Sequence, residues 1–243
     1  MNYLALALIM PLAACSFSWN DDEAGSGAPA QGAGGTRSYQ LSDFSEVDLR
    51  GSDDVDVRVG SGFSVRAEGP SELLDRLRID RDGDTLKIGR KNGTSMGWSK
   101  SGKVKVYVTL PRLTEANVSG SANLTIDRVE GAKFEGGIAG SGNLTVGALR
   151  VDEAEFSIAG SGNAVASGTA TSLHVSIAGS GDVDAQRLTA RTATVEIAGS
   201  GSARALVDGP AKVEVMGSGD VDLGPKARCT VSKMGSGTVR CGG

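Results

Sequence analysis

Residues 156–166 read FSIAGSGNAVA, with a short apolar run on each side of a Gly-Ser-Gly turn. Phe156 and Ile158 alternate with polar or small residues before the turn, and Ala164 and Ala166 do so after it. Alternation with a period of two is typical of a β-strand with one buried face. The stretch therefore predicts two short strands joined by a tight turn. A flexible hinge and a phosphate-binding loop are the other structures that such a glycine-rich turn can form.

The same turn recurs along the chain. Close copies are VSIAGSGDVDA at 175–185 and VEVMGSGDVDL at 213–223, and a more degenerate copy, VDLRGSDDVDV, surrounds Gly51. So regular a recurrence is typical of a repeat architecture, in which the glycines allow sharp corners and do not mark one binding loop. The first glycine of the turn recurs at intervals of 20, 20, 19, 20, 18 and 18 residues, at Gly120, Gly140, Gly160, Gly179, Gly199, Gly217 and Gly235.

Counted from that glycine, positions −4, −2, +4 and +6 are apolar in nearly every repeat. An antiparallel hairpin meander and a parallel solenoid both fit this order of strand, turn and strand. The solenoid is favoured because the repeats are nearly equal in length, share the same apolar positions and are too small to bury them alone. The sequence thus predicts an all-β fold, a parallel β-helix or β-solenoid of roughly 20-residue coils, with right-handed crossovers favoured.

The solenoid is predicted to have two parts. Residues 113–243 form the regular coils, and residues 40–112 form a β-rich cap. Within the cap, PSELLDRLRI at 70–79 predicts a helical turn with Ser71 as its N-cap. RIDRDGDTLKIGRK at 78–91 predicts a hairpin across its Asp-Gly pair. A cap is expected because the open edge of a solenoid would otherwise pair with other chains.

The first 15 residues, MNYLALALIMPLAAC, predict a secretion signal that is not part of the fold. Their apolar run is too short to span a bilayer and ends in small residues before a cysteine. This ending resembles the bacterial lipobox, which implies that Cys15 receives a lipid that holds the protein on the membrane. Ser16 after it implies sorting to the outer membrane. A cleaved signal without a lipid is the alternative. Residues 16–39 are rich in glycine, alanine and serine and predict a flexible tether.

The charge of the chain excludes one class of partner. It carries 25 basic and 29 acidic residues, a net charge of −4, and both signs are spread along the sequence. Nucleic-acid binding needs a basic patch or stripe, so no nucleic-acid partner is expected.

Cys229 and Cys241 occupy positions −6 and +6 around Gly235. Both positions point inward on opposite arms of one turn, so the two side chains are expected to face each other in the last coil. Export favours their oxidation, and a disulfide that closes a loop of this size contributes about 3 kcal/mol. A reduced pair or a metal site is the alternative, although the lack of a nearby histidine makes zinc a poor fit.

Three longer stretches and the later coils also match a known pattern. The stretches are FSEVDLRGSDDVDVRVG at 44–60, DGDTLKIGRK at 82–91 and VKVYVTLPRLTEANVSGSANLT at 104–125. On these the chain resembles the bacterial auto-transporter adhesin head GIN domain family over about residues 40–243. The resemblance implies the solenoid fold and, through the family's association with auto-transporter heads, adhesion. It carries over no set of functional residues.

No pattern predicts a catalytic group, a metal ion or a cofactor. The single histidine, His174, is expected on the outer surface of a strand, and the turn serines have no nearby base. Each glycine-rich turn leads into a strand and not a helix, which argues against a nucleotide-binding loop. Aspartate pairs such as Asp54 and Asp56 raise the alternative of a calcium site. The residue after the turn varies among Asn, Asp, Ser and Thr, which favours a ladder of short polar side chains instead.

The predicted function is binding without catalysis. The chain is expected to be an adhesin-like or scaffold lipoprotein of the cell envelope, with a glycan or an envelope protein as its partner. Trp98, in KNGTSMGWSKSGK at 91–103, is a candidate ligand contact, and packing over the end of the solenoid is the alternative. The alternative function is a polysaccharide-acting enzyme similar to β-helix lyases. A groove that gathers Asp, Arg and Lys from three adjacent coils would favour that enzyme.

Overall fold

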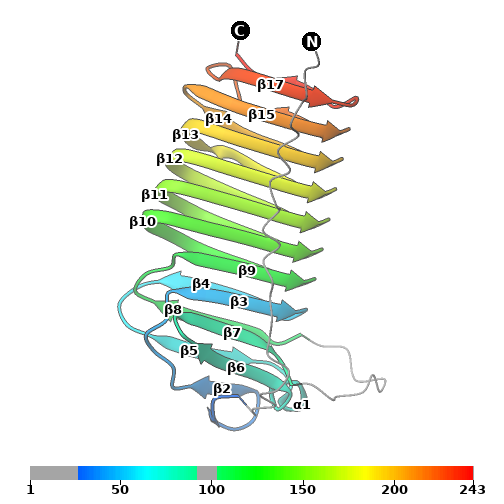
Figure 1. The fold of residues 1–243 in the computed structure, drawn as a ribbon. Coiled ribbons are helices and arrows are strands. Elements are labelled where there is room, and N and C mark those ends of the chain that lie inside the picture. The colour runs from blue at the N-terminus through cyan, green and yellow to red at the C-terminus, as the bar shows by residue number, and fades with distance from the viewer. Residues whose placement is uncertain (1–26, 92–102, 243) are drawn as a thin grey trace, which may run out of the picture.

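The computed structural model describes residues 27–91 and 103–242, which form a stack of β-coils above an N-terminal cap (Figure 1). Within these residues no helix is long and apolar enough to cross a membrane. The one helix described is α1 (Ser71–Leu74). The strands are β1 (Ala30–Gln31), β2 (Thr36–Tyr39), β3 (Glu46–Gly51), β4 (Asp54–Val59), β5 (Ser64–Glu68), β6 (Leu77–Asp82), β7 (Thr85–Arg90), β8 (Lys105–Leu110), β9 (Glu115–Gly120), β10 (Asn123–Gly140), β11 (Asn143–Gly160), β12 (Asn163–Gly179), β13 (Asp182–Gly199), β14 (Ser202–Val207), β15 (Pro210–Gly217), β16 (Asp220–Asp222), β17 (Arg228–Met234) and β18 (Val239–Arg240).

The strands stack in parallel and in register, which confirms the solenoid and rules out the hairpin meander. Successive corner glycines are register partners, as in the pairs Gly120 with Gly140 and Gly140 with Gly160. The −2 residues behave in the same way, since Ile138, Ile158 and Ile177 follow one another up the stack. The −2 column is therefore a ladder of aliphatic side chains up to β15, with neighbouring strands about 4.8 Å apart.

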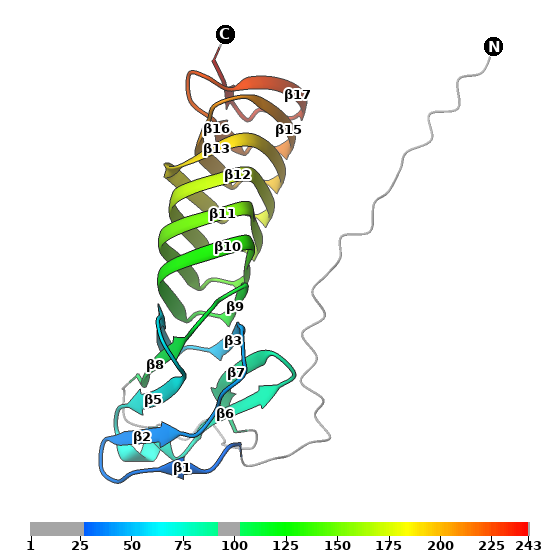
Figure 2. The same cartoon turned by 90° about the vertical axis from the view of Figure 1, so that its left-hand side faces the viewer.

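Each regular coil has three faces by its strand pairing, and Figure 2 shows the stacked coils from the side. Face 1 is the arm that leads into the glycine corner and contains β3, β7, β9, β15, β17 and the C-terminal parts of β10–β13. Face 2 is the arm after the corner and contains β4, β8, β14, β16, β18 and the N-terminal parts of β10–β13. Face 3 is the middle part of β10–β13, at residues 128–131, 148–151, 168–170 and 188–190.

The interior is filled by side chains whose sizes compensate between coils. At position −4, Gly136 is the register partner of Phe156. A Cβ at Gly136 would lie 2.7 Å from Leu144 Cδ2 and 3.1 Å from the Phe156 ring, so the glycine leaves room for that ring. The rings of Phe134 and Phe156 meet edge to face with their centroids 6.1 Å apart, and both side chains are fully buried.

Differences in repeat length are absorbed where face 2 meets face 3. The register between β11 and β12 shifts between Val146 and Leu149, and the register between β13 and β14 shifts between Ala185 and Thr189. Such bulges let one coil be shorter than the next without disturbing the corner. Faces 1 and 2 were predicted from the apolar columns, whereas face 3 was not.

The cap contains one rung that lies out of sequence order. β3 and β4 pair in parallel with β7 and β8 on one side and with β9 and β10 on the other. The rung around Gly51 therefore lies between two rungs that both follow it in the chain. Beyond β8, the antiparallel strands β5, β2 and β1 close face 2, and the antiparallel β6 closes face 1.

The predictions for the N-terminal region held in part. The flexible tether predicted over residues 16–39 is wrong for residues 30–39, because β1 and β2 lie there and pair with each other and with β5. The hairpin is present as β6 and β7, with Asp82 paired to Thr85. The helical turn is present as α1, but Ser71 is its first residue and not its N-cap. Pro70 occupies the N-cap position, and no side chain caps the helix. Proline fixes φ at this position but offers no side-chain acceptor, so the free amides of the first turn have no side-chain cap.

Candidate functional site

The glycine corners lie along one edge of the stack. Their φ angles range from 115° at Gly120 to 137° at Gly199, a backbone region that residues with a Cβ rarely adopt. At Gly160 an added Cβ would lie 2.4 Å from the carbonyl oxygen of Gly140 in the coil below. The same close approach recurs in the coils above, so the repeated turn is a corner of the scaffold and neither a hinge nor a phosphate loop.

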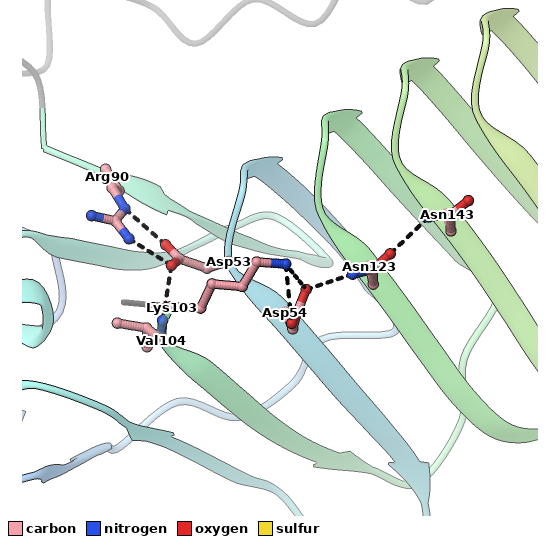
Figure 3. Close-up of polar contacts among 7 residues, drawn as sticks. All are labelled: Asp53, Asp54, Arg90, Lys103, Val104, Asn123 and Asn143. Atoms are coloured by element: carbon pink, nitrogen blue, oxygen red, sulfur yellow. Dashed lines mark hydrogen bonds and ion pairs between the residues drawn. The ribbon is translucent and has the colours of Figure 1, made fainter. Parts of the chain in front are cut away.

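The residues after the corners form a polar ladder on face 2. Asn123 donates to Asp54 at 2.8 Å, and Asn143 donates to Asn123 at 2.8 Å (Figure 3). In the next coil, Asn163 donates to Asn143 at 3.1 Å. Higher in the stack the ladder continues with backbone donors. The backbone amide of Ser202, for example, donates to the carboxylate of Asp182. This arrangement matches the predicted ladder of short polar side chains.

The aspartates considered for calcium already have protein partners. Asp54 accepts hydrogen bonds from Asn123 and Lys103, and those bonds hold its pKa below its usual value against the opposing effect of burial. Asp56 forms an ion pair with Lys105 at 2.8 Å. Within the described residues, no group of three or more His, Cys, Asp or Glu side chains is arranged to hold a metal ion.

An ion pair between a buried carboxylate and a partly exposed arginine joins the out-of-order rung to the cap. Asp53 is 2 % exposed and accepts two hydrogen bonds from Arg90, at 2.8 Å from Nε and 2.6 Å from Nη2 (Figure 3). The backbone amide of Val104 donates a third at 3.1 Å. The two-pronged contact with Arg90 fixes the geometry of the carboxylate, and the third donor satisfies it further. The pair lies where the β3–β4 corner, the end of β7 and the start of β8 meet, so we assign it a role in holding these segments together.

Face 1 carries a column of carboxylates on its outer side. Glu46, Glu115, Glu135 and Glu155 are successive register partners, and His174 follows them. Burial raises the pKa of Glu115, and the neighbouring carboxylates of Glu46 and Glu135 raise it further, against a hydrogen bond from Asn117. The column is therefore an array of like charges one strand apart, in which the proton affinity of Glu115 is increased.

Lys133 neutralises part of this column. Its ammonium lies 2.5 Å from Glu135, 3.2 Å from Glu153 and 3.5 Å from Glu155, and these contacts raise its pKa. A groove of about 330 Å³ opens beside it, and Arg112 lines the groove with Lys133 and the lower glutamates of the column. Acidic and basic groups of three successive rungs thus meet in one groove.

Asp48 is an acidic residue of β3 that neighbouring side chains cover. It lies on the outer side of β3 yet is only 5 % exposed, and its Oδ1 has no hydrogen-bond partner among the described residues. Burial raises its pKa to about 6, although Lys87 and Arg50 act in the opposite direction. A carboxyl group in such a place is destabilising when it is ionised.

Face 2 carries an aromatic ring on its outer side where it meets the cap. Asp56, Tyr107 and Arg66 are cross-strand partners on β4, β8 and β5. The Arg66 guanidinium lies 4.9 Å from the centroid of the Tyr107 ring, and the Lys105 ammonium lies 5.5 Å from it. These cation–π contacts hold two cationic groups against a partly exposed ring. Arg66 also forms an ion pair with Glu68.

A hollow of about 260 Å³ lies beside this ring, and Arg58, Ser64 and Thr109 line it with Asp56 and Arg66. The side chains of Arg58, Ser64 and Thr109 form no hydrogen bond or ion pair with any described residue. The hollow, called the Tyr107 hollow below, therefore offers one free guanidinium and two free hydroxyls beside an aromatic ring. No sequence pattern marked it, because β5 and β8 become neighbours only in the folded chain.

Three of the remaining predicted site residues lie within the described part of the chain. Cys229 and Cys241 face each other in the last coil and form a disulfide, with their Cα atoms 6.2 Å apart. His174 lies on the outer side of face 1, in register with Glu155 and Thr194. Cys15 and Trp98 lie outside the described residues.

Comparison with known proteins places this geometry in a family. Residues 43–242 match the family model described as "Putative auto-transporter adhesin, head GIN domain". No curated protein matches the chain. Among solved structures, a "putative adhesin" from Bacteroides fragilis is 19% identical with a TM-score of 0.75, over 85% of this chain and 95% of that one.

Two further structures share the fold. A "putative lipid binding protein" from Parabacteroides distasonis is 24% identical with a TM-score of 0.67, over 87% of this chain and 98% of that one. A "putative adhesin" from Parabacteroides merdae is 21% identical with a TM-score of 0.67, over 85% and 95%. At these identities the likeness is one of fold. Because the family model matches most of the chain, the protein belongs to the auto-transporter adhesin head GIN domain family.

Proposed function

We propose that the chain is an adhesin-like binding module of the cell envelope that acts without catalysis. The Tyr107 hollow is the observation that carries this proposal. It gathers an aromatic ring, two guanidinium groups and two free hydroxyls on an open sheet face. A few convergent polar groups around a preformed hollow are typical of a ligand site. The stacked strands hold these groups on a rigid scaffold, which lowers the entropic cost of binding.

The groups in the hollow define the chemistry of the ligand. The free guanidinium of Arg58 matches a carboxylate, which it can bind through two parallel hydrogen bonds. The hydroxyls of Ser64 and Thr109 and the carboxylate of Asp56 match sugar hydroxyls as donors or acceptors. The ligand is therefore a hydroxyl-rich chain that bears carboxylates, such as a glycan that contains uronic acids.

The proposal includes a lipid anchor at Cys15 in the outer membrane. The lipobox-like ending of MNYLALALIMPLAAC supports it. Because β1 and β2 belong to the cap, the tether is limited to residues 16–26, which would give the domain a reach of roughly 17–20 Å above the lipid. Metabolic labelling with a palmitate analogue is expected to mark the protein in the membrane fraction and to fail in Cys15→Ala. Labelling that persists in this variant would contradict the anchor.

The binding proposal is tested with three probes on the full chain. They are an oligosaccharide of uronic acids, a neutral oligosaccharide of equal length and vesicles of anionic phospholipid. Binding of the acidic oligosaccharide alone is expected, and Arg58→Ala should weaken it about tenfold or more because a charge-assisted hydrogen bond is lost. Arg204→Ala, which removes an exposed arginine further along face 2, is the matched control. Equal binding by both variants, or binding to vesicles alone, would contradict the proposed ligand.

A second candidate function is a polysaccharide-acting enzyme, and the groove on face 1 favours it. Glu46, Glu115 and Glu135 from three successive rungs meet Arg112 and Lys133 there. The raised pKa of Glu115 suits a carboxyl group that exchanges a proton during a reaction. This mixture of acidic and basic groups is what a lyase-like site would need.

A turnover assay separates the two functions. The acidic oligosaccharide is incubated with the full chain, and its length distribution and the ultraviolet absorbance of unsaturated products are followed. Unchanged length supports binding alone. Turnover that disappears in Glu115→Gln but persists in Glu196→Gln, an outer face 1 carboxylate away from the groove, would establish the enzyme instead.

A further inference from the structure

The two ends of the solenoid are closed in different ways. At the N-terminal end, the outer edge of β6 is covered by residues 27 and 28, since the amide of Ala28 donates to the carbonyl of Ile79 at 2.9 Å. At the C-terminal end, no described strand pairs with the outer edges of β17 or β18. Val231 of β17 is an inward residue by register, yet it is 47% exposed. The last coil thus offers free strand edges and part of its apolar interior, which is the arrangement that invites pairing with a second chain.

Lys233 breaks the apolar column at this end. It is the register partner of Val215 at position −2, which Val or Ile fills in the coils from β9 to β15. Its ammonium reaches across the corner and donates to the carbonyl oxygen of Gly237 at 2.7 Å. A charged group therefore lies where the interior of the next coil would begin.

The other charged side chains near this end also oppose the association of two copies. The charged side chains among residues 223–242 are all basic. They are Lys226, Arg228, Lys233 and Arg240. Two copies that met end to end would bring these groups together. An inward-pointing charge on an edge strand is a recognised device against edge-to-edge association.

We propose that Lys233 closes the C-terminal end of the solenoid against a second copy of the chain, and that this end is a latent self-association surface. Pairing of β17 with its counterpart would bury the Lys233 ammonium between two apolar interiors, where its desolvation opposes association. Without that charge, the exposed Val231 and the free edge of β17 are expected to pair with the same elements of another copy. This inference is independent of the ligand of the Tyr107 hollow.

The test compares molar masses by size-exclusion chromatography with light scattering. The full chain carries Cys15→Ala in every sample, so that neither a lipid nor a third thiol contributes to association. The parent protein is expected to be monomeric. Lys233→Ile is expected to double the mass at equal concentration, and amide hydrogen exchange should then show new protection in β17.

Two further variants make the result specific. Lys226→Ile removes an equal charge from the same end but outside the inward column, so it should remain monomeric. Lys233→Ile combined with Val231→Asp restores an inward charge and should return to a monomer. The inference is overturned if folded Lys233→Ile stays monomeric, if Lys226→Ile associates equally, or if the double variant remains dimeric. If Lys233→Ile does not fold, Lys233→Val is judged by the same criteria.

Discussion

Arg90 donates two hydrogen bonds to the carboxylate of Asp53, and this contact joins the last residue of β7 to the corner between β3 and β4. The two segments belong to rungs that stack out of sequence order. A buried carboxylate with three donors is satisfied only when both rungs are in place. The pair therefore links the cap to the first coils of the solenoid.

Replacing Arg90 by Met is expected to destabilise the domain by about 3–5 kcal/mol, because the Asp53 carboxylate is left buried without its cationic partner. Urea unfolding of the two proteins measures this difference. The control is Lys226→Met, which breaks an ion pair with Asp208 between two exposed side chains. Its cost should stay below about 1 kcal/mol. Equal losses in the two variants would contradict the role assigned to Asp53.

The buried Asp48 should make stability depend on pH. Its pKa in the folded protein, about 6, lies above the ordinary value of 3.8. The folded state then holds the proton more tightly than the unfolded chain, so stability is lost as the pH rises from about 4 to about 6. Two pKa units correspond to roughly 3 kcal/mol. Asp48→Asn should remove this loss, as measured by urea unfolding at both ends of the window. A difference between the two proteins that does not change with pH would refute the assignment.

Substitutions at two corner glycines distinguish the cost of backbone strain from the cost of steric overlap. Gly51 and Gly160 have φ angles of 117° and 130°, but an added Cβ meets nothing within 4 Å at Gly51 and a carbonyl oxygen at 2.4 Å at Gly160. Gly51→Ala should cost about 1–3 kcal/mol through its backbone conformation alone. Gly160→Ala should cost at least about 1 kcal/mol more, because the coil below must move. Thermal unfolding of both variants tests this order, and an equal or smaller cost at Gly160 would contradict the stacked corner.

Loss of the disulfide should loosen one end of the stack and leave its middle intact. Replacing Cys229 and Cys241 by serine removes the crosslink that closes the last coil, which is worth about 3 kcal/mol. Because each coil contacts only its neighbours, amides of β17 and β18 should exchange faster while those of β11 and β12 keep their protection. Uniform loss of protection along the solenoid would show that the coils unfold as a single unit.

The coil architecture could be predicted because two periods coincide in the sequence. Residues such as Ile158 and Ile177 alternate within a strand and also recur in each repeat, and parallel stacking is favoured because each repeat is too small to bury them alone. The facing positions of Cys229 and Cys241 followed from the same alignment. Face 3 was missed because bulges, such as the one between Val146 and Leu149, shift its inward residues from repeat to repeat.

The candidate sites depended on contacts that no local pattern contains. The rung around Gly51 alternates like every other rung, so its sequence fits any position in the stack and did not predict insertion between β7 and β9. Alternation placed Asp48 outward but could not predict that its neighbours cover it. The Tyr107 hollow depends on Arg66 from β5, an antiparallel neighbour that only the folded cap supplies.

The central claim is that the Tyr107 hollow binds an acidic glycan and leaves it unchanged. Calorimetric titration of the full chain with an oligosaccharide of uronic acids, followed by analysis of the recovered sugar, tests it most directly. Saturable binding that weakens about tenfold in Arg58→Ala, with the oligosaccharide recovered at its original length, is the predicted result. Binding that is indifferent to Arg58, or recovery of shortened sugar, would contradict the claim.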